Sequence, residues 1–135
     1  MFPNTQTNIF NKKIVRRKKQ EKLREENFWN TFYYFNKPSE PEVIPCHFKR
    51  VNFRIWDQVN DDDVMRMNSR VSSIYQLDLD ETDISIDAIE SLTRMDFITE
   101  LRLKGISELD NDCIKFLDKI YGLELLHIGG TSITL

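Results

Sequence analysis

Residues 74–135 carry a repeating pattern that decides the fold. Written in register, the stretch reads IYQLDLDETDISIDAIESLTRMDF (74–97), ITELRLKGISELDNDCIKFLDKIYG (98–122) and LELLHIGGTSITL (123–135). Leu77 recurs as Leu101 and Leu126, and Leu79 recurs as Leu103 and Ile128, at offsets of 24 and then 25 residues. Apolar residues separated by one polar residue are typical of a strand with one buried face. A repeat of this length predicts a row of similar units that bury a shared core.

These repeats resemble the leucine-rich repeat family. Its form Leu-x-x-Leu-x-Leu ends in a turn whose matching residues are Thr82, Ile84, Ser85 and Asp87 in the first unit and Thr131, Ile133 and Thr134 in the last. The second unit departs from the form, because residues 105–109 replace the threonine turn. The resemblance covers about residues 70–135 and implies an α/β fold. That fold is a short solenoid of parallel strands with return helices at 85–95 and 109–120.

A second, narrower resemblance concerns residues 74–125. This stretch is similar to the short repeat domain of mitochondrial coupling factor B and the distal membrane-arm assembly proteins. The residues that carry the similarity are the Ile-x-x-Leu-Asp-x-x-x-Thr-Asp run at 74–83, the run Ile98-Thr-Glu-Leu-Arg-Leu, the pair Asp112-Cys113 and the pair Phe28-Trp29. It implies an assembly or coupling factor of a respiratory complex, on the matrix side of the mitochondrial membrane.

The chain divides into three predicted regions, 1–41, 42–73 and 74–135. The first is a basic, then aromatic, helical extension from about residue 9 to 35 with a linker, because strong helix formers dominate until Pro38. The second is an N-terminal cap of the solenoid, with a strand at about 50–56 and a short helix at the aspartates 61–63. The third holds about two and a half repeats.

Both ends of a solenoid need a cover. At the first end, we expect the strand at 50–56 and the aromatic residues of 23–35 to supply it. At the other end, no further repeat follows the strand predicted at 123–128. A parallel edge with unpaired amides and carbonyls is a template for pairing. We therefore expect a second copy or a partner chain at this edge.

The outward positions of the predicted strands form rows one repeat apart on the concave face. A protein-binding surface on this face would use Gln76, Asp78, Asp80, Glu100, Arg102, Lys104, Leu125 and His127. A solvated face with mutually neutralising charges is the alternative interpretation, and the two weigh about equally. The pattern favours a non-enzymatic protein-binding module.

Candidate chemistry elsewhere is sparse. No nucleophile motif accompanies the predicted row Asp78, Arg102 and His127, so we expect no enzyme and no cofactor. Cys46, His47 and Cys113 lack the paired spacing of a zinc site, and Cys113 lies where repeat helices bury a small residue. The aspartates at 61–63 are better explained as helix caps than as calcium ligands. Two cysteines and no long apolar run favour a cytoplasmic protein.

Charge is distributed unevenly along the chain. Residues 1–24 carry eight basic residues and one acidic residue, whereas 25–135 carry eleven basic and twenty-one acidic residues. Binding to an anionic partner such as nucleic acid would use Lys12, Lys13, Arg16, Arg17, Lys18 and Lys19. A solvated helix is the simpler interpretation of this segment. A bacterial toxin-immunity partner also fits the small size and the acidic body.

Overall fold

The computed structural model describes residues 4–38 and 45–135, with the backbone alone for residues 4–14. The chain forms two compact units, whose boundary lies between Tyr34 and Phe35. The first unit is a single helix up to that boundary, and the second contains a sheet. The molecule is therefore an α/β protein with an N-terminal helix, as the sequence predicts at this coarse level.

Helix α1 (Asn4–Phe35) accounts for the described part of the first unit and is confirmed by the structure. It begins about five residues before the predicted start. Near its end, Phe28, Trp29 and Phe32 are buried, and their ring centroids lie 4.9–5.8 Å apart. The indole Nε1 of Trp29 donates to Glu25 Oε1 at 2.9 Å, one helical turn earlier. The predicted aromatic end of the helix is thus a packed cluster.

The second unit is built on a four-stranded parallel sheet in the order β1-β2-β3-β4. Its strands are β1 (His47–Asn52), β2 (Ser73–Asp78), β3 (Phe97–Arg102) and β4 (Leu125–His127). The predicted register is confirmed, because Leu77 pairs with Leu101 and Leu101 with Leu126. Val51 of β1 pairs with Leu77 in the same row. Strand β1 begins three residues before the predicted start of 50, and it joins the sheet in the same register as the others.

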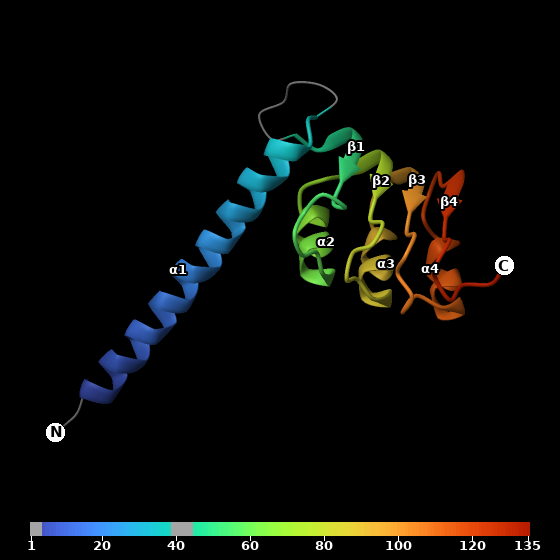
Figure 1. Ribbon diagram of the computed structural model, residues 1–135. Helices are drawn as coiled ribbons and strands as arrows, with labels where there is room; N and C mark the ends of the chain where they lie inside the picture. Colours follow the sequence, from blue (N-terminus) through green and yellow to red (C-terminus); the bar gives the residue numbers. More distant parts are fainter. Residues whose placement is uncertain (1–3, 39–44) are drawn as a thin grey trace. The chain divides into compact units, whose positions relative to one another are not determined.

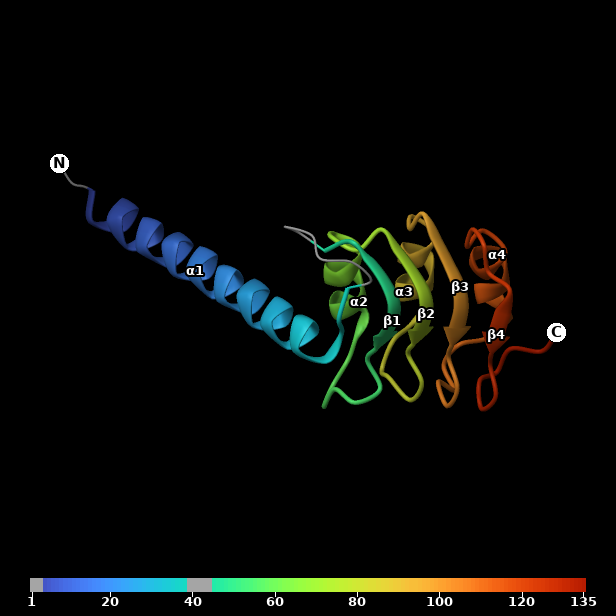
Figure 2. The same cartoon turned by 90° about the horizontal axis from the view of Figure 1, so that it is seen from above.

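Short helices connect consecutive strands on one face of the sheet (Figures 1 and 2). They are α2 (Asp61–Asn68), α3 (Ile86–Leu92), the 3₁₀ turn η1 (Asn111–Cys113) and α4 (Ile114–Leu117). The segments predicted at 85–95 and 109–120 are helical only in their central parts. At α3, the N–H of Thr93 donates to the carbonyls of Glu90 and Ser91, and this tight last turn ends the helix.

The three helix starts share one capping device. The side chains of Asn60, Ser85 and Asp110 accept hydrogen bonds from the amides of Asp63, Asp87 and Asp112, at 3.3, 3.2 and 3.0 Å. Such caps satisfy amides that have no partner within the helix. The backbone amide of Asn60 also donates to Asp63 Oδ2, which completes a capping box. Helix capping therefore explains these carboxylates, as the sequence predicts.

The core lies between the sheet and the helices, and its residues stack from strand to strand. Leu77, Leu79, Leu101 and Leu103 have no exposed surface. Burying each such side chain contributes about 1.5–3 kcal/mol relative to its exposed state. Cys113 is also buried, and burial raises the pKa of its thiol. This placement agrees with the predicted packing role of Cys113.

The turns after the strands repeat as well. Glu81, Gly105 and Gly130 follow β2, β3 and β4 and have φ values of 60°, 80° and 77°. A side chain is costly in this left-handed region, which glycine adopts freely. Stacking adds a second constraint, because a Cβ built on Gly130 would lie 3.1 Å from the amide nitrogen of Gly105. Glu81 is the sole non-glycine with positive φ among the described residues.

Candidate functional site

The sheet has one face covered by α2, α3 and α4, and we call the other its open face (Figure 2). Strand pairing brings the predicted side chains together there. The first row is Arg50, Gln76, Glu100 and Leu125, and the second is Asn52, Asp78, Arg102 and His127. Sequence reasoning missed Arg50 and Asn52 because β1 was assigned to a cap. An offset of 26 residues, which aligns Val51 with Leu77, is the signal that would have found them.

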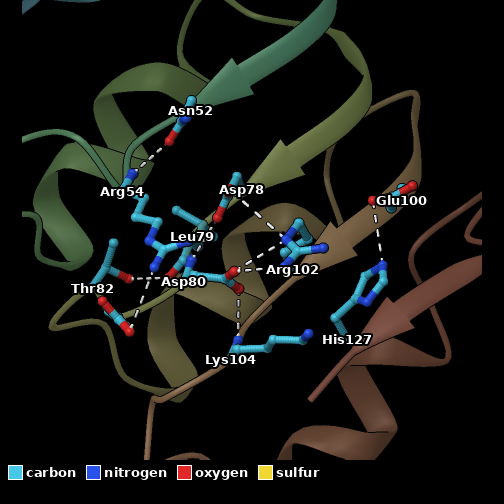
Figure 3. Close-up of polar contacts among 11 residues, drawn as sticks. Asn52, Arg54, Asp78, Leu79, Asp80, Thr82, Glu100, Arg102, Lys104 and His127 are labelled. Atoms are coloured by element: carbon cyan, nitrogen blue, oxygen red, sulfur yellow. Dashed lines mark hydrogen bonds and ion pairs between the residues drawn. The ribbon is translucent and has the colours of Figure 1, made fainter. Parts of the chain in front are cut away.

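Arg102 is the centre of a charge network on this face (Figure 3). Its Nε donates to Asp80 Oδ2 at 3.1 Å, and its Nη2 lies 3.0 Å from the same oxygen. Nε also lies 3.8 Å from Asp78 Oδ2. Two carboxylates of one strand region therefore hold a guanidinium of the next strand. Charge-assisted contacts of this kind are about twice as strong as neutral hydrogen bonds.

Asp80 differs from the other predicted site residues because it is buried, with 2% of its surface exposed. Its second carboxylate oxygen accepts the backbone amide of Lys104 at 2.8 Å. The amide of Asp80 itself donates to Asp78 Oδ1 at 2.9 Å. These bonds tie the end of β2 to the segment after β3. The expectation of an outward side chain in the row Asp80, Lys104 and Gly129 therefore requires correction at Asp80, which holds Arg102 and the chain.

The remaining charges on the open face are also paired. His127 Nε2 lies 3.3 Å from Glu100 Oε2, which is an ion pair when the ring is protonated. Beside the face, Arg54 Nη2 lies 3.8 Å from Glu81 Oε1, and both side chains are more than half exposed. Exposed pairs of this kind contribute only about 0–1 kcal/mol. Lys104 is exposed on the same face. The open face is thus a polar surface with little net charge.

A groove that sequence reasoning missed borders the open face where the strands begin. It is lined by His47, Phe48, Lys49, Ser73, Tyr75 and Phe97. His47 Nδ1 lies within hydrogen-bond distance of Ser73 Oγ, at 2.6 Å. Each of these residues precedes a predicted row by one to three positions. No repeat of identical residue types marks the groove, and only the outward positions of the strands could have indicated it.

The predicted basic segment lies on α1. The side chains of Arg16, Arg17, Lys18 and Lys19 are exposed, and none has an ion-pair partner among the described residues. Further along, Arg24 Nη1 lies 3.5 Å from Glu21 Oε2. The side chains of Lys12 and Lys13 lie outside the described residues. The segment therefore presents a continuous run of cationic side chains.

The described residues contain no group of three histidine, cysteine or acidic side chains placed to hold a metal ion. Among them, no helix has both the length and the apolar character needed to cross a membrane. Comparison with known proteins found no matching family model, and no significant match among curated proteins or solved structures. The functional argument therefore rests on the geometry of this chain.

Proposed function

We propose that this protein is a non-enzymatic protein-binding module, built as a short leucine-rich repeat solenoid, whose open face contacts the partner. The observation that carries the proposal is the fixed placement of polar side chains in two rows across four strands. A partner lying across the strands would meet hydrogen-bonding groups spaced by the strand separation of about 4.8 Å. Assembly of a respiratory complex and neutralisation of a toxin are both protein-binding roles that such a face would serve.

Pairing within the face supports this role. Arg102 and His127 each lie beside a carboxylate, so their side chains are held before a partner arrives. Side chains that are already ordered lose less entropy on binding, and each saves about 0.5–1.5 kcal/mol. Because the charges offset one another, we expect binding to the open face to depend weakly on salt.

The test compares substitutions on the two sides of the sheet. Leu125 is 54% exposed on the open face, and Met65 is 40% exposed on α2. Each is replaced by glutamate, and the two variants and the original protein are used to capture partners for quantitative mass spectrometry. We expect Leu125→Glu to weaken capture of a specific partner about tenfold or more, since a charge replaces an apolar contact.

Met65→Glu introduces the same charge away from the open face and should leave that partner's capture unchanged. Thermal melts of both variants show that the fold is retained. Equal loss of the partner in both variants, or in neither, would contradict the proposal. This design avoids Arg102→Glu, since a third carboxylate beside Asp78 and Asp80 would disturb the fold itself.

A second candidate function follows from the exposed cations of α1. A run of unpaired basic side chains attracts phosphate backbones without reading their sequence. We propose nucleic-acid binding by Arg16, Arg17, Lys18 and Lys19 as this alternative. Replacing all four by glutamine should reduce affinity for a short duplex and flatten its salt dependence by roughly 0.9 per lost phosphate contact. Unchanged affinity in that variant would remove this candidate.

A further inference from the structure

The groove beside the open face is part of the same strand register. His47, Ser73 and Phe97 pair side by side at the beginning of β1, β2 and β3. Lys49 and Tyr75 directly precede Arg50 and Gln76 of the first row. The groove has a volume of about 280 Å³, which is enough for one large side chain of a partner. It is therefore continuous with the surface that the proposed function uses.

The walls of the groove are aromatic. Phe48 is buried, whereas Tyr75 and Phe97 are 59% and 38% exposed. Large apolar side chains in a depression beside polar groups are the residues that carry most binding energy in protein interfaces. The open face itself offers Leu125 as its sole large apolar contact among the predicted residues. The groove supplies the apolar anchor that the polar rows lack.

The charged groups at the groove select the flanks of the anchor. Lys49 is exposed at its wall, His47 is also exposed, and Arg50 follows on the same strand. No carboxylate lines the groove. An apolar side chain would enter between Tyr75 and Phe97, and carboxylates on either side of it would meet these cationic groups. A peptide with basic flanks would instead meet like charges.

From this complementarity we infer that the groove binds an apolar side chain flanked by acidic residues in a partner polypeptide. The inference rests on the proposed protein-binding function and names the chemistry of the partner. Its core is the juxtaposition of Tyr75 and Phe97 with Lys49 on three adjacent strands. Binding of this type depends on salt through Lys49, in contrast to binding at the paired charges of the open face.

The probe is a blocked hexapeptide with leucine and phenylalanine at its centre and two acidic residues on each side. Titration into the full ¹⁵N-labelled chain should shift the amide signals of residues 47–49, 73–75 and 97. Tyr75→Ser should weaken peptide affinity about tenfold, as expected for loss of an aromatic anchor. Lys49→Glu should weaken it as well, and raised salt should do the same in the original protein.

Tyr121→Ser is the matched control, because Tyr121 is 76% exposed and lies outside the groove lining. It should leave peptide affinity unchanged, and thermal melts confirm that all variants fold. Equal affinity for a peptide with lysine flanks, or unchanged affinity in Tyr75→Ser, would overturn the inference. Capture of a partner that depends on Leu125 would survive either result, so the two proposals fail separately.

Discussion

The Asp80 carboxylate joins two strands through three contacts. It accepts the Nε of Arg102 at 3.1 Å, lies 3.0 Å from Nη2 and accepts the amide of Lys104 at 2.8 Å. Because Asp80 is buried and Arg102 is partly exposed, the pair is protected from water on the carboxylate side only. Removing the carboxylate would leave a backbone amide and a guanidinium with fewer partners. Asp80 therefore contributes to stability, although its position suggested a binding role.

We predict that Asp80→Ala lowers the free energy of unfolding by about 3 kcal/mol, since removing one partner of a buried pair leaves the others unsatisfied. Urea denaturation followed by circular dichroism measures this change. Glu100→Ala is the control, because Glu100 contacts only His127 on the same face, and it should cost less than about 1 kcal/mol. A loss below 1 kcal/mol in Asp80→Ala would contradict the structural role of the carboxylate.

Glu81 occupies a backbone conformation that the corresponding turns give to glycine. We predict that Glu81→Gly raises the free energy of unfolding by about 0.5–1 kcal/mol, because relief of the left-handed strain exceeds the loss of an exposed pair with Arg54. Gly130→Ala should have the opposite effect, since its Cβ would meet the backbone of Gly105 at 3.1 Å. Denaturant midpoints measure both. A destabilised Glu81→Gly would show that the pair with Arg54 outweighs the strain.

Strands and helices are held together mainly by the stacked leucines. Leu101 lies between Leu77 and Leu126 in the sheet and has no exposed surface. Leu101→Asp should abolish the cooperative melt at moderate temperature, because an unpaired carboxylate would be buried in an apolar core. Circular dichroism during heating measures it. A melt at an unchanged temperature would be incompatible with this register.

The elements also explain which expectations were accurate. The two-residue alternation placed Leu77, Leu101 and Leu126 in one row, since a buried face imposes that spacing. Helix limits were predicted less well, because side-chain caps and tight last turns decide them, as at Ser85 and Thr93. Strand β1 was displaced by three residues, because Pro45 and Cys46 gave no clear starting signal.

At the scale of the whole second unit, the sheet has one edge at β4. This strand pairs with β3 alone among the described residues, and Leu126 is half-buried where Leu77 and Leu101 are fully buried. Backbone groups on an open edge exchange with water or pair with another chain. The earlier expectation of a second copy or partner at this edge remains a prediction.

We expect the amides of Leu125, Leu126 and His127 to exchange faster with deuterium than those of β2 and β3 at low protein concentration. Protection that increases with concentration, together with dimers in light scattering, would indicate a second copy at the edge. Full protection of these amides in a strict monomer would contradict an open edge. Amides of Ile74 and Ile98 serve as internal references, because both residues are buried in central strands.

The sequence by itself determined the parallel sheet, its register and the capped helices, because a repeat of 24 or 25 residues brings equivalent side chains to one height in every unit. Tertiary structure decided what each outward residue contacts. Asp80 is buried because the chain turns over it after β2, and Arg102 follows its charge. The groove of Tyr75 and Phe97 joins residues from different strands, so only their pairing creates it. Patterns along a chain specify spacing, whereas burial and ion pairs depend on neighbours that the spacing does not name.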